Sequence, residues 1–242
     1  MTFVVGFHCF DGLVLCADSE ENDGINKKYV DKLYGLEVSA ERQLCFGGAG
    51  SATAIDKFHS KLSDILAWND FDEIKTELHV ESVLDHMAKS YPHLGFDILL
   101  AQIETEKEQT LLYRTYQGEA SLRPIEMGSF ACVGMDTSLA QFLLGNLFDS
   151  FTQIEEALQL GIWVTNMSKI HAHGVSGPSA AFSYRRGDKD GWKRHYTPEI
   201  SSIEDKYPLE EIRQMLHGYW VRKNPNIYKI LGGLPVRGTP NK

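Results

Sequence analysis

Residues 2–19 read TFVVGFHCFDGLVLCADS, and the architecture expected for the whole chain starts from this stretch. Two apolar runs flank an Asp-Gly pair at positions 11 and 12, which is a strong signal for a tight turn between antiparallel strands. We therefore predict a β-hairpin with strands over residues 3–9 and 13–17. The second strand ends directly before the acidic residue Asp18.

The rest of the chain alternates between groups of strands and groups of helices. Helix predictions rest on apolar residues at helical spacing, such as Ile55, Phe58 and Leu62, and strand predictions rest on short apolar runs between turn residues. The polar segment 19–28 is predicted to be a loop, and the Gly-rich segment 47–50 is predicted to end a strand. The expected strands cover residues 32–38, 43–46, 96–103, 110–116, 120–122, 130–133, 180–184 and 192–196, and the expected helices cover residues 51–66, 80–90, 137–148 and 153–170.

This order of elements predicts an α+β fold. Strands, two helices, strands, two helices and strands fit a four-layer α-β-β-α sandwich, in which two antiparallel sheets are flanked by helices. We expect this domain to cover residues 1–200, followed by a C-terminal extension over residues 201–242. From Tyr219 onwards the extension has no acidic residue, and its basic residues are Arg222, Lys223, Lys229, Arg237 and Lys242.

Composition and charge exclude several classes of function. The formal net charge of −9 argues against nucleic acid as the main partner. No apolar run approaches the roughly 20 residues that span a bilayer, so we expect no membrane partner. No basic region precedes the apolar residues at the N-terminus, so we expect a cytoplasmic protein. The four cysteines have no metal-binding spacing and are expected to be buried thiols: Cys9, Cys16, Cys45 and Cys132.

Thr2 is a candidate nucleophile, although a threonine at this position is by itself a weak signal. Methionine aminopeptidase acts when the second residue is small, so removal of Met1 would give Thr2 a free α-amine beside its hydroxyl group. An α-amine has a pKa of about 7.7–8.0, so part of it is neutral at physiological pH and can accept the hydroxyl proton. This arrangement is the threonine and N-terminal amine form of an activated nucleophile.

The opening of the chain, residues 2–6 and 11–19, resembles that of proteasome β subunits and their bacterial relatives, which are N-terminal nucleophile (Ntn) hydrolases. The resemblance implies the Ntn hydrolase fold with Thr2 as nucleophile, Asp18 as a buried acid and Lys32 as a catalytic lysine. Asp18 stands 16 positions after Thr2, as in the family, and the loop before Lys32 is about two residues shorter. A nearby ammonium would lower the pKa of the Thr2 hydroxyl and α-amine, and Asp18 would offset its charge.

The resemblance also implies a source of hydrogen bonds for the oxyanion of the reaction. The Gly-rich segment 47–50 would supply a backbone N–H, with Gly50 as the first candidate and Gly48 as the next. Glycine lets the backbone approach a substrate closely, and the N-terminus of the helix that follows favours negative charge. An ordinary turn between a strand and a helix would look the same in the sequence.

Two further positions are matched only in part. Ser176 fits the serine that the family has after its last core helix, whereas His173 stands where the family has an aspartate. His173 is therefore a candidate for proton handling or for a structural role. The family's serine near residues 134–136 is absent, and Asp136 is a candidate substitute.

The leading hypothesis is a threonine-type peptidase or amidohydrolase that cleaves peptide or amide bonds. Thr2 would form an acyl-enzyme, and water would resolve it. The alternatives are a peptide ligase or transpeptidase with the same nucleophile, and a non-catalytic ring or scaffold subunit. The resemblance implies a homo-oligomer, either a ring or a helical assembly, acting on peptides or unfolded proteins, and it leaves open an unfoldase partner. No metal or organic cofactor is required by this chemistry.

Overall fold

The computed structural model describes residues 2–22, 27–68, 76–116, 119–135 and 137–206. The chain divides into two compact units, Met1–Glu204 and Asp205–Lys242. Nearly all of the second unit, including the basic tail that begins at Tyr219, lies outside the described residues. The description that follows therefore concerns the first unit.

The predicted hairpin forms the centre of the first five-stranded sheet. Strands β1 (Phe3–Cys9) and β2 (Gly12–Ala17) pair antiparallel, and both are completely buried. The sheet has the order β10-β1-β2-β11-β12, where the other strands are β10 (Ser129–Gly134), β11 (Ala180–Arg185) and β12 (Lys193–His195). The turn requires Gly12, because a Cβ atom at this position would lie 1.9 Å from the carbonyl oxygen of Tyr184.

The second five-stranded sheet has the order β5-β6-β7-β8-β9. Its strands are β5 (Leu33–Glu37), β6 (Arg42–Gly50), β7 (Phe96–Glu104), β8 (Gln109–Arg114) and β9 (Arg123–Ile125). A small third sheet joins β3 (Glu20–Asn22) to β4 (Lys27–Tyr29). The neighbouring strands of all three sheets pair antiparallel; β1–β2 and β7–β8 are consecutive along the chain, whereas β6 and β7 are connected through α1 and α2.

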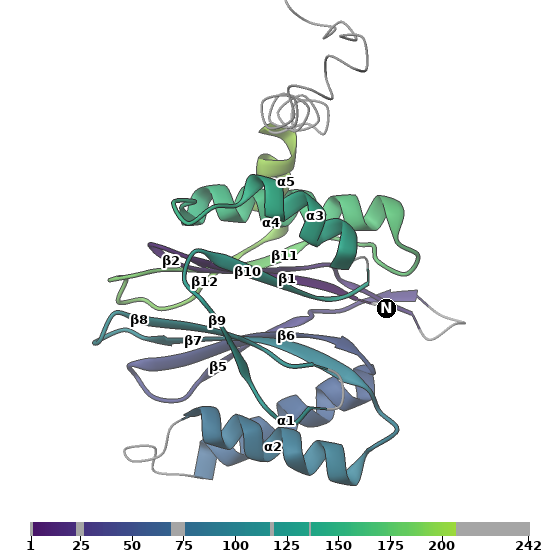
Figure 1. The fold of residues 1–242 in the computed structure, drawn as a ribbon, viewed down its shortest axis with the longest axis vertical. Helices are drawn as coiled ribbons and strands as arrows, with labels where there is room; N and C mark the ends of the chain where they lie inside the picture. Colours follow the sequence, from purple (N-terminus) through teal and green to yellow (C-terminus); the bar gives the residue numbers. More distant parts are fainter. Residues whose placement is uncertain (1, 23–26, 69–75, 117–118, 136, 207–242) are drawn as a thin grey trace, which may run out of the picture. The chain divides into compact units, whose positions relative to one another are not determined.

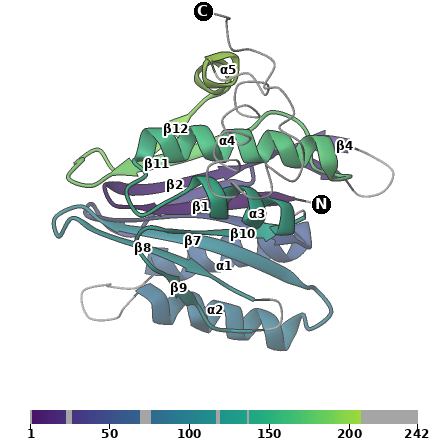
Figure 2. The ribbon, with the colours of Figure 1, turned by 45° about the horizontal axis from the view of Figure 1, so that its top comes forward.

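The two five-stranded sheets pack face to face through alternate side chains of their strands (Figures 1 and 2). Every second residue of a strand points to the same face, so one face of each sheet supplies this core. Its members come from both sheets and include Val4, Leu13, Leu15, Leu33, Leu99, Ile103, Leu112, Phe182 and Tyr184. The buried apolar surface between the sheets fixes the end of β2 beside the start of β5, where the site described below lies.

Helices cover the outer face of each five-stranded sheet (Figure 1). Helices α1 (Ala52–Trp68) and α2 (Thr76–Ser90) bury their apolar faces against β6, β7 and β8. Helices α3 (Thr137–Leu147) and α4 (Ile154–His171) cover the first sheet, and α5 (Thr197–Lys206) follows β12. In the part of the chain that the structure describes, no helix is both long and apolar enough to cross a membrane.

The α+β class predicted from the order of elements is confirmed, and the four-layer description is confirmed only in part, because the described residues form three sheets. The prediction of a loop over residues 19–28 was wrong, since β3 and β4 lie there. The strand predicted over residues 120–122 lies instead at Arg123–Ile125, and α5 was not predicted. These elements are short or polar, so their apolar pattern gives little signal.

The strand predicted over residues 43–46 was too short, because β6 runs Arg42–Gly50 and includes the glycines that were predicted to break it. The glycines there serve close packing. A Cβ atom at Gly47 would lie 2.8 Å from side-chain atoms of Val4 and Leu33, and one at Gly48 would lie 2.8 Å from Ile55. Only at Gly50 does φ become positive, at 114°, where glycine is favoured over other residues.

Candidate active site

Thr2 lies directly before β1 and is almost completely buried, with 8% of its surface exposed. Its carbonyl oxygen accepts a hydrogen bond from the backbone N–H of Met135, at 2.9 Å. Gly134, with φ of 102°, permits this contact, because a Cβ atom there would lie 1.9 Å from the same carbonyl oxygen. The backbone of Thr2 is therefore held by the end of β10.

Asp18 lies directly after β2 and has no exposed surface. One carboxylate oxygen, Oδ1, accepts a hydrogen bond from the Phe3 backbone N–H at 2.9 Å. The other, Oδ2, accepts from the Glu20 backbone N–H at 3.1 Å and from Lys32 Nζ at 2.9 Å. These three hydrogen bonds give both oxygens of a fully buried carboxylate a partner inside the protein.

Lys32 lies directly before β5, and 7% of its side chain is exposed. Burial lowers the pKa of its ammonium group, and the negative charge of Asp18 opposes this shift most strongly. The carboxylates of Glu20 and Glu21 act in the same direction as Asp18. The ion pair with Asp18 thus keeps a buried positive charge in the wall that Thr2 also lines.

Thr2 and Lys32 open into one cavity of about 460 Å³. Gly48 and Gly50 line the same cavity, so the structure brings the predicted nucleophile, the lysine and both predicted oxyanion residues together. The remaining lining side chains are mostly polar or charged: Glu21, Lys28, Tyr34, Ser51, Thr53 and Asp56 among them. Asp18 lies behind this wall and contacts it through Lys32.

The predictions for the other three residues have different outcomes. Ser176 lies near the site, since its carbonyl oxygen accepts hydrogen bonds from the backbone N–H groups of Ser19 and Glu20, at 3.3 and 3.0 Å. His173 is exposed in the loop after α4 and does not belong to the residues that line the cavity. Asp136 lies outside the described residues.

Glu20 is a residue of the site that the sequence analysis missed. Its side chain is 1% exposed, and its carboxylate accepts a hydrogen bond from the Ser176 hydroxyl group. Lys27 forms an ion pair with it, at 3.2 Å. The only signal in the sequence was its place two residues after Asp18, and an acidic residue in a polar segment gives no reason to expect burial.

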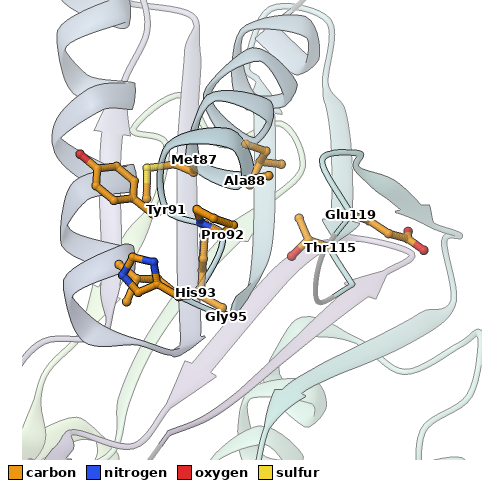
Figure 3. A pocket seen from close by; sticks show the side chains of 11 residues that line it. Met87, Ala88, Tyr91, Pro92, His93, Gly95, Thr115 and Glu119 are labelled. Carbon is orange, nitrogen blue, oxygen red and sulfur yellow. The ribbon is translucent and has the colours of Figure 1, made fainter.

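A second cavity, of about 380 Å³, lies between the end of α2 and the segment after β8 (Figure 3). Tyr91, Met87 and His93 line one side of it, and Thr115 and Glu119 lie opposite. None of the described residues predicted to be catalytic lines this cavity, so the cavity at Thr2 is the candidate active site. Among the described residues, no group of three or more His, Cys, Asp or Glu side chains is placed to hold a metal ion.

Comparison with known proteins gives matches among solved structures alone. No family model matches the chain, and no curated protein matches it. The Anbu Gly-1 mutant from Hyphomicrobium sp. strain MC1 is similar, with a TM-score of 0.76 and 18% identity, over 90% of this chain and 97% of that one. Anbu from Yersinia bercovieri, described as an ancestral beta-subunit, has a TM-score of 0.74 and 14% identity, and both chains are covered completely, at 100%.

The helical assembly of the Anbu complex from Pseudomonas aeruginosa supplies a third similar chain, with a TM-score of 0.68 and 19% identity over 99% of each chain. At these identities the comparison shows a shared fold. The expected resemblance to a bacterial-type 20S proteasome β subunit was therefore wrong: these similar solved structures are Anbu proteins. A few short matching segments, around Thr2, Asp18 and Ser176, are too few to distinguish related folds.

Proposed function

We propose that this chain is a subunit of a proteasome-like homo-oligomer with the four-layer Ntn hydrolase fold, and that Thr2 acts in it as the nucleophile of a threonine-type amidohydrolase. The observation that carries the proposal is the buried Lys32–Asp18 ion pair in the wall of the cavity that Thr2 lines. In this proposal residues 1–200 form the hydrolase domain, and residues 201–242 form the extension.

The proposed reaction uses groups that the cavity contains. After removal of Met1, the α-amine of Thr2 accepts the proton of its hydroxyl group, and the oxygen attacks a peptide or amide carbonyl. The Lys32 ammonium lowers the pKa of the hydroxyl group, and a backbone N–H of the segment from Gly48 to Gly50 stabilises the oxyanion. The amine product leaves with a proton, and water hydrolyses the acyl-enzyme. This chemistry needs no cofactor.

A non-catalytic assembly subunit is the second candidate, and a specific observation favours it. The position at which the family has an aspartate holds His173, which is exposed and does not line the cavity. One similar structure is described by its helical assembly. In this candidate the Asp18–Lys32 pair would serve to position β1 and β5.

The deciding measurement is the intact mass of the purified protein before and after treatment with a β-lactone that reacts with N-terminal threonine. We expect loss of Met1 and one added reagent in the wild type and in Thr2→Ser, which keeps a hydroxyl group, and no addition in Thr2→Ala. A mass that retains Met1 without an adduct would contradict the catalytic role and support the assembly subunit.

The assembly itself is tested separately, by sedimentation velocity and electron microscopy of the same preparation. We expect a closed ring or an open helical particle, because heterologous contacts between identical subunits give one or the other. A monomer at micromolar concentration would overturn this half of the proposal.

A further inference from the structure

Glu20 is a second buried carboxylate beside the Asp18–Lys32 pair. Its side chain is 1% exposed, although it belongs to the polar three-residue strand β3. A carboxylate in such a place requires paired charges or hydrogen bonds, because removing an unpaired charge from water is unfavourable. The structure supplies both, through Ser176 and Lys27.

The contacts of Glu20 join the end of β2 and strand β4 to the Ser176 turn, which is far away in the sequence. Its backbone N–H donates to Asp18 Oδ2 at 3.1 Å and also to the carbonyl oxygen of Ser176 at 3.0 Å. Its carboxylate accepts from the Ser176 hydroxyl group and pairs with Lys27 of β4. Glu20 thus fixes the Ser176 turn against the residue that holds Lys32.

The charge of Glu20 acts on Lys32 as well. Burial lowers the pKa of the Lys32 ammonium, and the carboxylates that face it oppose the shift: Asp18 first, then Glu20 and Glu21. Of these, Glu21 pairs with Lys28 at 3.1 Å and is more exposed than the other two carboxylates. Of these three carboxylates, Asp18 and Glu20 are the buried ones; Glu20 also pairs with the exposed Lys27, and its backbone N–H donates to the same Asp18 oxygen that Lys32 contacts.

We propose that Glu20 is a positioning residue of the Thr2 site, which orients the Ser176 hydroxyl group and, together with Asp18, keeps the Lys32 ammonium protonated. The part that concerns reactivity rests on the proposed function of Thr2. The part that concerns Lys32 does not, because the protonation of Lys32 is measurable in a protein without any activity.

The test of the charge is the pKa of Lys32, measured by NMR of lysine side chains in the full chain, with Lys32→Arg used to assign the signal. In Glu20→Gln, which keeps the size of the side chain and removes its charge, we expect this pKa to fall by about one unit. The matched control is Glu37→Gln, at the exposed far end of β5, which should leave it unchanged. An unchanged pKa in Glu20→Gln would overturn the electrostatic role.

The test of orientation uses Glu20→Asp, which keeps the charge and withdraws the carboxylate from Ser176 by one methylene group. In Glu20→Asp we expect the pKa of Lys32 to stay close to that of the wild type, while β-lactone labelling of Thr2 slows about tenfold. Ser176→Ala should slow labelling by the same factor, and the double variant, with both changes, should be no slower than either single variant. If the two changes slow labelling independently in the double variant, or if Glu20→Asp is labelled at the wild-type rate, Glu20 does not orient Ser176. Glu20→Asp also serves as the second variant if Glu20→Gln does not fold.

The pH dependence of β-lactone labelling of Thr2 connects the protonation of Lys32 with the reactivity of Thr2. Because only the protonated Lys32 assists Thr2, we expect the alkaline limb of the labelling profile to move to lower pH in Glu20→Gln and to stay in place in Glu37→Gln. If the wild type gives no adduct at all, the proposed function of Thr2 fails, and the NMR measurement still decides the role of Glu20.

Discussion

At the scale of single residues, the candidate site depends on how a buried carboxylate and a buried ammonium satisfy each other. Asp18 accepts hydrogen bonds from the backbone of Phe3, the backbone of Glu20 and the side chain of Lys32. The same carboxylate therefore orients the lysine and holds the first residues of β1, next to Thr2. A change at Asp18 should affect both stability and reactivity.

Replacing Asp18 with Asn should lower the free energy of unfolding by about 3 kcal/mol, because it leaves the Lys32 ammonium buried without its partner charge. Urea unfolding at pH 7 measures the loss. The control is Asp190→Asn, in an exposed turn, which should change the midpoint little. Equal midpoints for Asp18→Asn and the wild type would show that the pair contributes no stability.

The residues of the site were predictable to different extents. Thr2, Asp18 and Lys32 belong to a recognisable spacing, and Gly48 and Gly50 follow from the same resemblance. Glu20 was missed, because its burial arises from the Ser176 turn, which is remote in the sequence and folds back over it. A tertiary contact between distant segments leaves no local pattern to detect.

At the scale of elements, the packing of α4 on the first sheet depends on one glycine. A Cβ atom at Gly161 would lie 2.6 Å from the Cys16 sulfur and 3.0 Å from the Phe7 ring. The helix can therefore approach β1 and β2 only where this side chain is absent. Gly145, in α3, has open space around it.

These two helical glycines provide a matched pair of variants. Gly161→Ala should destabilise the protein by about 1–3 kcal/mol through overpacking. Gly145→Ala should be neutral or stabilise it by up to about 1 kcal/mol, because alanine favours a helix. Thermal unfolding of both variants checks the prediction. A stabilised Gly161→Ala would mean that α4 moves away from the sheet without cost.

The elements with a strong apolar pattern were predicted well, and the others were not. The hairpin of β1 and β2 and the helices α1 and α4 follow from turn chemistry and helical spacing. The strands β3 and β4 are polar and three residues long, so their pairing is set by the fold around them. The glycines of β6 look like a break in the sequence, because the side chains that pack closely against them, Val4, Leu33 and Ile55, come from other elements of the fold.

At the scale of the whole molecule, two buried histidines connect separate parts of the fold. His8 of β1 contacts the Ile125 carbonyl oxygen through Nδ1, at 2.9 Å, and Thr110 through Nε2, at 3.1 Å. A carbonyl oxygen only accepts, so Nδ1 carries the proton and Nε2 accepts from the Thr110 hydroxyl group. His195 lies within hydrogen-bonding distance of Ser183, at 2.8 Å.

Acid should therefore weaken the fold. Burial lowers the pKa of both His8 and His195 below the ordinary value of 6.5. The unfolded chain then binds protons more readily than the folded chain, so stability falls as pH falls through about 6.5. We expect a loss of up to about 1.4 kcal/mol for each histidine between pH 7.5 and 5.5, measured by urea unfolding.

Variants separate the histidines from the other titrating groups. His8→Gln should reduce the loss of stability between the two pH values, and His93→Gln, at an exposed position, should leave it unchanged. A stability that is constant between pH 7.5 and 5.5 in the wild type would contradict the assignment of buried neutral histidines.

The four cysteines lie buried in the sheets, without disulfides. Burial raises the pKa of the Cys9 and Cys132 thiols to about 12 and raises those of Cys16 and Cys45 further still. Because the thiolate is the reactive form, these thiols are unreactive toward electrophiles at neutral pH. The cysteines therefore do not compete for a covalent probe applied to the folded protein. A single added mass then shows that a hydroxyl group or an amine has reacted, rather than a thiol.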